Sequence, residues 1–124
     1  ASAGVELLLD TTTGRALQKL LPVGAQWWVP EHFFVEVAGA LRRAEIHQAV
    51  TSARIATAFE DLTNSPLRRV QVRPLLPEAW ARRGNLTIPD ALYVVLAEHL
   101  GATLVTCDLK LANAPGMNVP VIHP

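Results

Sequence analysis

Residues 88–108 read IPDALYVVLAEHLGATLVTCD, and this stretch decides the fold. Residues 88–100 are strongly apolar and rich in the helix-favouring Ala, Leu and Glu, so we predict a buried helix with Gly101 as its C-cap. Residues 103–106 predict a short strand that runs directly into Asp108. In α/β folds, ligand sites gather beyond the carboxyl ends of such strands. Asp108 is therefore a candidate site residue.

The rest of the chain also alternates helices with short strands. Residues 26–29 favour a strand, and we expect Pro30 in the first turn of the following helix. Strands separated by helices pair in parallel, so the pattern predicts an α/β domain. The other predicted elements are helices at 5–9, 17–21, 33–43, 48–62 and 77–80, with Val50, Ile55, Phe59 and Leu62 as core candidates, and strands at 70–72 and 119–122.

Length and composition indicate one domain over residues 1–124. Half of the residues are apolar, which is enough to form a core. The apolar stretches are too short to span a bilayer and no basic leader is seen, so we expect no membrane span and a cytoplasmic protein. A single cysteine, Cys107, excludes an internal disulfide and agrees with a reducing compartment.

Charge does not point to nucleic acid by itself. Eleven basic residues balance eleven acidic ones, so a polyanion must be held locally. Arginine pairs at 42–43, 68–69 and 82–83 suit phosphate, although solvated helix surface is their commoner role. Trp27 and Trp28 point to opposite faces of a strand, and we expect one of them in the core. The four histidines lack metal-ligand spacing and are expected at surface or boundary positions, and Tyr93 is interpreted as a packing residue.

Three acidic residues occupy places where a charged carboxylate is costly unless it is paired or bound to metal. Glu36 lies in an apolar helix face, Asp90 opens the apolar helix, and Asp108 follows the strand. Each alone has a simpler explanation. Asp90 would favour a helix dipole, Asp108 would cap a turn, and Glu36 would pair with an arginine. Their arrangement together favours a functional site.

The segments IPDALYVVLAE (88–98) and ATLVTCD (102–108) closely resemble the C-terminal signature of PIN-domain nucleases, particularly VapC-type toxins. Pro30, followed by Glu36-Val37 and by LRR at 41–43, resembles the second acidic motif of that family. Residues 1–3 resemble the sequence after its first aspartate. The resemblance covers nearly the whole chain.

This resemblance implies a three-layer α/β/α sandwich with a central parallel sheet. It also implies an acidic pocket made of Glu36, Asp90 and Asp108, with a further aspartate at the end of a first strand. That strand and its aspartate do not occur in residues 1–124, and we expect them immediately before Ala1. Asp10 does not replace the aspartate easily, because a predicted helix carries it roughly 13 Å away at 1.5 Å per residue.

The chemistry of the acids agrees with this resemblance. Hard carboxylate oxygens suit Mg²⁺ or Mn²⁺ rather than zinc, and such an ion activates water and stabilises charge on a phosphate. We expect Asp90 and Asp108 to be metal ligands and Glu36 to be a ligand or a water-orienting acid. Thr106 and Ser2 are expected as supporting hydroxyls, although Thr106 is equally well explained as a β-favouring residue.

The leading hypothesis is a metal-dependent endoribonuclease that acts as the toxin of a toxin–antitoxin pair. The resemblance also implies an antitoxin protein as partner and a homodimer. One alternative is a catalytically silent PIN-like binding module, and another is a phosphatase or other metal hydrolase. Nucleotide-binding and serine-hydrolase functions lack support, because the sequence has neither a Gly-rich phosphate loop nor a Gly-x-Ser-x-Gly elbow.

Overall fold

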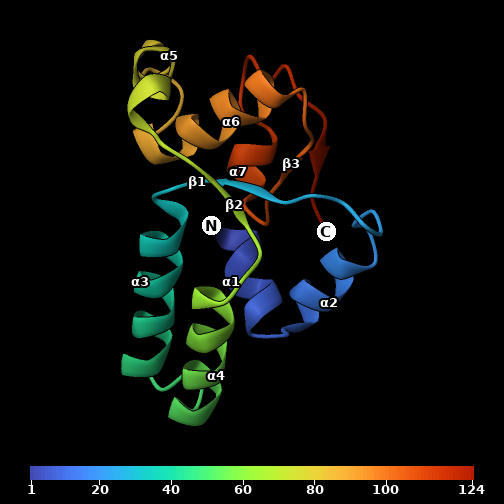
Figure 1. The fold of residues 1–124 in the computed structure, drawn as a ribbon, viewed down its shortest axis with the longest axis vertical. Helices are drawn as coiled ribbons and strands as arrows, with labels where there is room; N and C mark the ends of the chain where they lie inside the picture. The colour runs from blue at the N-terminus through green and yellow to red at the C-terminus, as the bar shows by residue number, and fades with distance from the viewer.

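Helices and short strands alternate along the chain in the computed structural model, which describes residues 1–124 (Figure 1). The helices are α1 (Ser2–Leu8), α2 (Thr12–Gln18), α3 (Phe33–Ile46), α4 (Ser52–Thr63), α5 (Leu76–Ala81), α6 (Ile88–Leu100) and α7 (Leu109–Ala112), with a 3₁₀ turn η1 (Arg73–Leu75). The strands are β1 (Trp28–Pro30), β2 (Arg68–Val70), β3 (Leu104–Val105) and β4 (Val121–Ile122). The predicted α/β alternation is confirmed. None of the helices is both long and apolar enough to cross a membrane.

The strands form two parallel pairs, as the helical connections predict. Trp28 is in register with Arg68 in the β1–β2 pair, and Leu104 is in register with Val121 in the β3–β4 pair. The two pairs are not hydrogen-bonded to each other. A largely apolar cavity of about 460 Å³ is lined by residues of both pairs, and also by α1 and α6. The sheet layer therefore consists of two strand pairs with a cavity shared between them.

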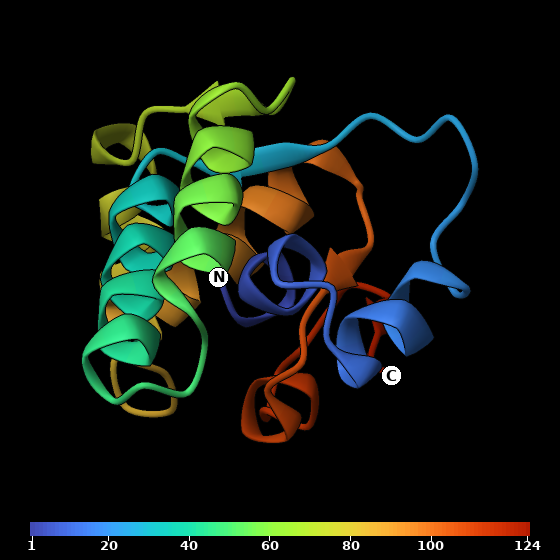
Figure 2. The same cartoon turned by 90° about the horizontal axis from the view of Figure 1, so that it is seen from below.

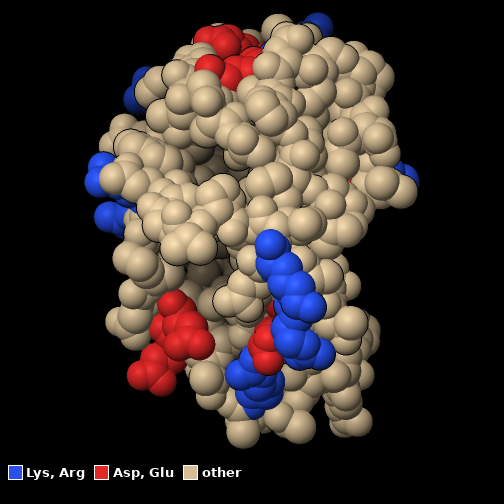
Figure 3. Space-filling view, turned by 90° about the vertical axis from the view of Figure 1, so that its right-hand side faces the viewer, with Lys and Arg blue, Asp and Glu red and all other residues tan.

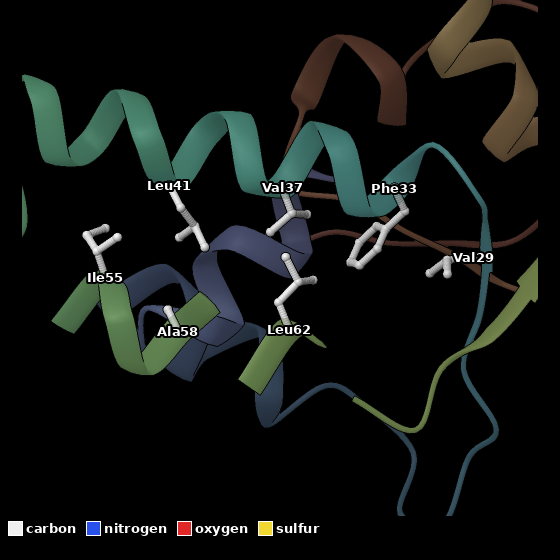
Figure 4. Packing of buried hydrophobic residues seen from close by; sticks show 7 residues of the cluster. All are labelled: Val29, Phe33, Val37, Leu41, Ile55, Ala58 and Leu62. Atoms are coloured by element: carbon white, nitrogen blue, oxygen red, sulfur yellow. The ribbon is translucent and has the colours of Figure 1, made fainter. Parts of the chain in front are cut away.

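The α3–α4 hairpin carries the largest buried cluster (Figures 1 and 4). Residues four apart share a face of a helix, so the buried side chains of α3 form a single stripe toward α4. The cluster consists of Val29, Phe33, Val37, Leu41, Ile55, Ala58 and Leu62. Helix α1 lies in the middle of the molecule and contacts α2, α3 and α4 (Figure 2). The prediction of Phe59 as a core residue is wrong: its side chain is 50% exposed, because Ala58 occupies the inward position on α4.

Helix α6 is the most extensively buried element and matches its predicted bounds. Thr87 caps its first turn by accepting a hydrogen bond from the Asp90 amide. Gly101 ends it in the left-handed conformation with φ 59°, which glycine adopts without steric cost. Leu92 packs toward α5 and Val94 packs toward β3, so α6 joins two parts of the core. This packing fixes the start of α6, where Asp90 lies.

Two local predictions around β1 are wrong. Pro30 ends the strand instead of entering the next helix, because two residues separate it from the start of α3 at Phe33. Neither tryptophan is fully buried. Trp27 is half-buried, whereas Trp28 is exposed and lies under the Arg68 guanidinium at 5.2 Å. The second strand begins two residues earlier than predicted, at Arg68, where it pairs with β1.

Candidate active site

All five site residues predicted from the sequence line one small polar pocket of about 160 Å³. The pocket lies where β3 ends and where α1, α3 and α6 begin. Its lining residues are Ala1, Ser2, Glu36, Asp90, Tyr93, Leu104, Val105, Thr106, Asp108 and Leu111. Three carboxylates that lie far apart in the sequence therefore face a shared space.

Glu36 lies in the first turn of α3, where the helix dipole favours a negative charge. Its side chain is 33% exposed. The Tyr93 hydroxyl donates a 2.7 Å hydrogen bond to Glu36 Oε1, and His32 Nε2 lies 3.3 Å from the same oxygen. Glu36 therefore has two partners, a tyrosine and a histidine. It does not pair with an arginine, which was the simpler explanation for this acid.

Asp90 lies in the first turn of α6 and is half-buried. Thr87 already caps this helix, so the carboxylate of Asp90 is not needed as the cap. Asp90 makes no ion pair with an arginine or lysine; the four ion pairs of the chain join other residues. Its carboxylate is therefore available to a ligand in the pocket.

Asp108 is exposed and has a structural role as well. It is the N-cap of α7, and its Oδ1 accepts hydrogen bonds from the Lys110 amide at 2.8 Å and the Leu111 amide at 3.3 Å. These bonds hold the side chain in one orientation and leave Oδ2 without a partner in the chain. The simpler explanation of Asp108 as a cap is thus correct, and it does not exclude a role for Oδ2 in the pocket.

Ser2 and Thr106 connect the start of α1 to the segment after β3. Their hydroxyl oxygens lie 3.3 Å apart. The Thr106 hydroxyl accepts from the Asp108 amide at 3.0 Å, and the Ser2 hydroxyl accepts from the Cys107 amide at 3.1 Å. Thr106 is 3% exposed and is the one polar residue among the fully buried set. Both hydroxyls therefore shape the turn that presents Asp108, so Thr106 does more than extend a strand.

The spacing of the acids in the pocket bears on how they could hold a metal ion. No group of three or more His, Cys, Asp or Glu side chains is close enough to enclose a metal ion directly. The donor set fits a hydrated Mg²⁺ or Mn²⁺, which commonly keeps several waters between itself and carboxylates.

Sequence reasoning missed two residues of this site, Tyr93 and His32. Tyr93 packs as expected, but its hydroxyl also binds Glu36. His32 lies at a boundary position as expected, but its Nε2 also lies 3.2 Å from the Pro89 carbonyl and close to Glu36. Helical spacing offered a signal for both. Tyr93 lies three residues after Asp90, and His32 lies four before Glu36, so each pair shares a helix face.

Several of the paired arginines are engaged in structural contacts. The Arg82 guanidinium binds both carboxylate oxygens of Glu98 at 2.7 and 2.6 Å, which ties the end of α5 to α6. Arg83 lies over the Trp80 ring at 4.8 Å. On the face shown in Figure 3, charged side chains form small separate groups on an otherwise uncharged surface. These observations favour the structural explanation for Arg82 and Arg83 over phosphate binding.

Comparison with known proteins identifies the family to which this chain belongs. The model of the PIN domain family matches residues 1–117, and the chain belongs to this family. Ribonuclease VapC12 of Mycobacterium tuberculosis is 38% identical over 121 residues, which are 98% of this chain and 93% of that protein. Ribonuclease VapC3 of the same species is 40% identical over 114 residues, which are 92% and 83% of the two chains. Within the PIN family the chain is of the VapC type, so the resemblance seen at residues 88–108 and the PIN-like α/β fold are confirmed.

Proposed function

We propose that this protein is a metal-dependent endoribonuclease that acts as the toxin of a toxin–antitoxin pair. The observation that carries the proposal is the convergence of Glu36, Asp90 and Asp108, from three separate segments, on one polar pocket. The relatives are named ribonucleases of the VapC type, which supports RNA as the substrate. The buried Thr106 and the well-packed α6 hold Asp108 and Asp90 on rigid elements, as a hydrolytic site requires.

Each acid has a role in this proposal. Asp90 and Asp108 Oδ2 hold Mg²⁺ or Mn²⁺, either directly or through water, and Glu36 is a further ligand or orients a water. Once bound, such an ion supplies an activated water and neutralises charge on the scissile phosphate. Ser2 and Thr106 fix the turn before Asp108. The carboxylates attract the cation, and the cation lets a negative pocket accept a polyanion.

We further propose that a parallel strand ending in an aspartate fills the cavity between β1 and β3, as the family resemblance implies. The inner edge of β3 supports this proposal. The Leu104 and Thr106 amides donate to β4, so the N–H and C=O of Val105 point toward the cavity side. The last residue of such a strand would lie near Ala1, at the rim of the polar pocket. A chain that carries this strand should bind Mn²⁺ more tightly than residues 1–124 do.

The proposed partners follow from the chemistry of the pocket. An antitoxin protein that inserts a basic side chain toward the acids would block metal and RNA together, because a guanidinium pairs strongly with carboxylates. We also propose a homodimer and a cytoplasmic location, where RNA is accessible. Loss of RNA cleavage when the antitoxin binds is the expected result. A complex that leaves cleavage untouched would contradict this mode of inhibition.

The test is RNA cleavage by the wild-type chain and by Asp90→Asn. RNA 5′ ends are mapped after brief expression, and the purified proteins are assayed with Mg²⁺, with Mn²⁺ and with EDTA. We expect new 5′ ends with the wild type but not with Asp90→Asn, and no cleavage in EDTA. Asp61→Asn, an exposed acid on α4 away from the pocket, is the matched control and should cleave normally. Wild-type cleavage by folded Asp90→Asn would overturn the assignment of Asp90.

The same experiment separates this function from the alternatives. The absence of three acids at direct coordination distance is the observation that favours a silent binding module. A module of that kind would bind RNA with both metals present and leave it intact. A phosphatase would release phosphate from a phosphomonoester faster than it cuts RNA.

A further inference from the structure

We propose that Tyr93 is a positioning residue that holds Glu36 so that one oxygen of its carboxylate is presented to the metal. This inference rests on the proposed function, because it concerns the same pocket. It gives a positioning role to a residue of α6 that the sequence alone suggests is only a packing residue.

The geometry around Glu36 Oε1 carries this proposal. Asp90 and Tyr93 lie one turn apart on α6, so the helix that presents Asp90 also brings the tyrosine ring toward α3. The Tyr93 hydroxyl donates to Glu36 Oε1 at 2.7 Å across 57 residues of sequence. Neighbouring α6 residues are fully buried, so the helix gives the tyrosine a fixed base. The bond therefore sets the position of Glu36 relative to Asp90.

His32 lies close to the same oxygen. Its Nε2 lies 3.3 Å from Glu36 Oε1 and 3.2 Å from the Pro89 carbonyl. Both neighbours are acceptors, which means that Nε2 carries a hydrogen. The His32 and Tyr93 rings are in contact, with centroids 4.9 Å apart and planes inclined by 59°. The two rings therefore pack together, and both contact Glu36 Oε1.

The contacts with Tyr93 and His32 make the two carboxylate oxygens of Glu36 different. Oε1 is occupied by Tyr93 and His32, while Oε2 has no hydrogen-bond partner in the chain. A carboxylate that is fixed in advance loses less conformational freedom when it binds a cation. Oε2 is therefore the oxygen that we expect to face the ion or its bound water.

The test measures Mn²⁺ binding directly, by the electron paramagnetic resonance signal of the free ion during titration of the folded protein. Tyr93→Phe keeps the ring and removes only the hydroxyl. We expect it to weaken Mn²⁺ binding about tenfold, the lower end of the effect of losing an outer partner of a metal ligand. Ser65→Ala is the matched control, because it removes one half-buried hydroxyl that donates to the Leu62 carbonyl, away from the polar pocket. It should leave Mn²⁺ binding unchanged.

A double-mutant cycle shows whether Tyr93 acts through Glu36. In a Glu36→Ala background, Tyr93→Phe should cause no further loss of Mn²⁺ affinity. Circular dichroism confirms that each variant is folded. Unchanged or tighter binding by Tyr93→Phe, or an equal loss in both backgrounds, would overturn the inference while leaving the metal site in place. Absence of Mn²⁺ binding by the wild type would overturn the metal site itself and the inference with it.

Discussion

Asp108 is a helix cap and a proposed metal ligand, and a pair of substitutions can separate the two roles. Its Oδ1 caps α7 through the Lys110 and Leu111 amides, and its Oδ2 is proposed to face the metal. Asp108→Asn keeps an oxygen that can accept the cap bonds but removes the negative charge. Asp108→Ala removes both. We expect both variants to lose metal-dependent RNA cleavage, and only the alanine variant to lose stability.

The size of the stability difference follows from the cap. Replacing an Asp or Asn N-cap by alanine costs about 0.5–2 kcal/mol, and two amides of α7 lose their partner here. Leu111, on the same short helix, is buried against α6 and β3, so fraying of α7 would loosen this packing. Both variants lose the repulsion between the Asp108 charge and its acidic neighbours, so this effect cancels between them. Asp108→Ala should therefore be about 1 kcal/mol less stable than Asp108→Asn, or about 4 °C lower in melting temperature.

The two quantities are measured separately. Urea unfolding and thermal melting in EDTA give stability without a contribution from bound metal, and cleavage of a mapped RNA in Mn²⁺ gives activity. Equal stability of the alanine and asparagine variants would refute the cap argument. Wild-type cleavage by Asp108→Asn would refute the proposed role of Oδ2 in metal binding.

Two further predictions concern the core and the single cysteine. Leu41→Ala should lower the free energy of unfolding by about 2–5 kcal/mol in urea, because Leu41 is 1% exposed between α3 and α4. Ile46→Ala, at a position that is 56% exposed, should change it little, and similar losses for the two would contradict the assigned core. Burial, and then the charge of Glu6, raise the pKa of the Cys107 thiol, so less thiolate is present at pH 8 than in a free cysteine. Alkylation by iodoacetamide at pH 8 should be slower in the folded protein than in guanidinium, and equal rates would contradict this.

The sequence predicted the helices well where burial and capping agreed. For α6, the apolar run and Gly101 predict the same bounds, and the structure has them. The strands were less predictable, because β3 and β4 are each two residues long and their bounds depend on pairing. Pairing also explains why β2 begins two residues before the predicted strand, since Trp28 of β1 is in register with Arg68. A short run of β-favouring residues does not contain this information.

The acidic residues were predictable for a different reason. Each lies close to a helix or strand end whose signal is local, and the family resemblance implies that Glu36, Asp90 and Asp108 share a pocket. Their supporting contacts are not local. The Tyr93–Glu36 bond spans 57 residues and the Ser2–Thr106 contact spans 104, so both depend on how whole elements pack. Periodicity can place a tyrosine on a helix face, but it does not identify the side chain that the tyrosine meets.

The three acids are held in three different ways, so a substitution at each should affect folding and function differently. Thr87 caps α6, so Asp90 has no capping role, whereas Asp108 is itself the cap of α7. Glu36 is held by Tyr93 and His32. Loss of charge at Asp90 should therefore affect function with little effect on folding. At Asp108 the fold and the site are coupled through one side chain, whereas Glu36 depends on a neighbour that can be altered without touching the acid. We therefore expect Tyr93 to be the position at which metal affinity can be tuned while all three carboxylates remain in place.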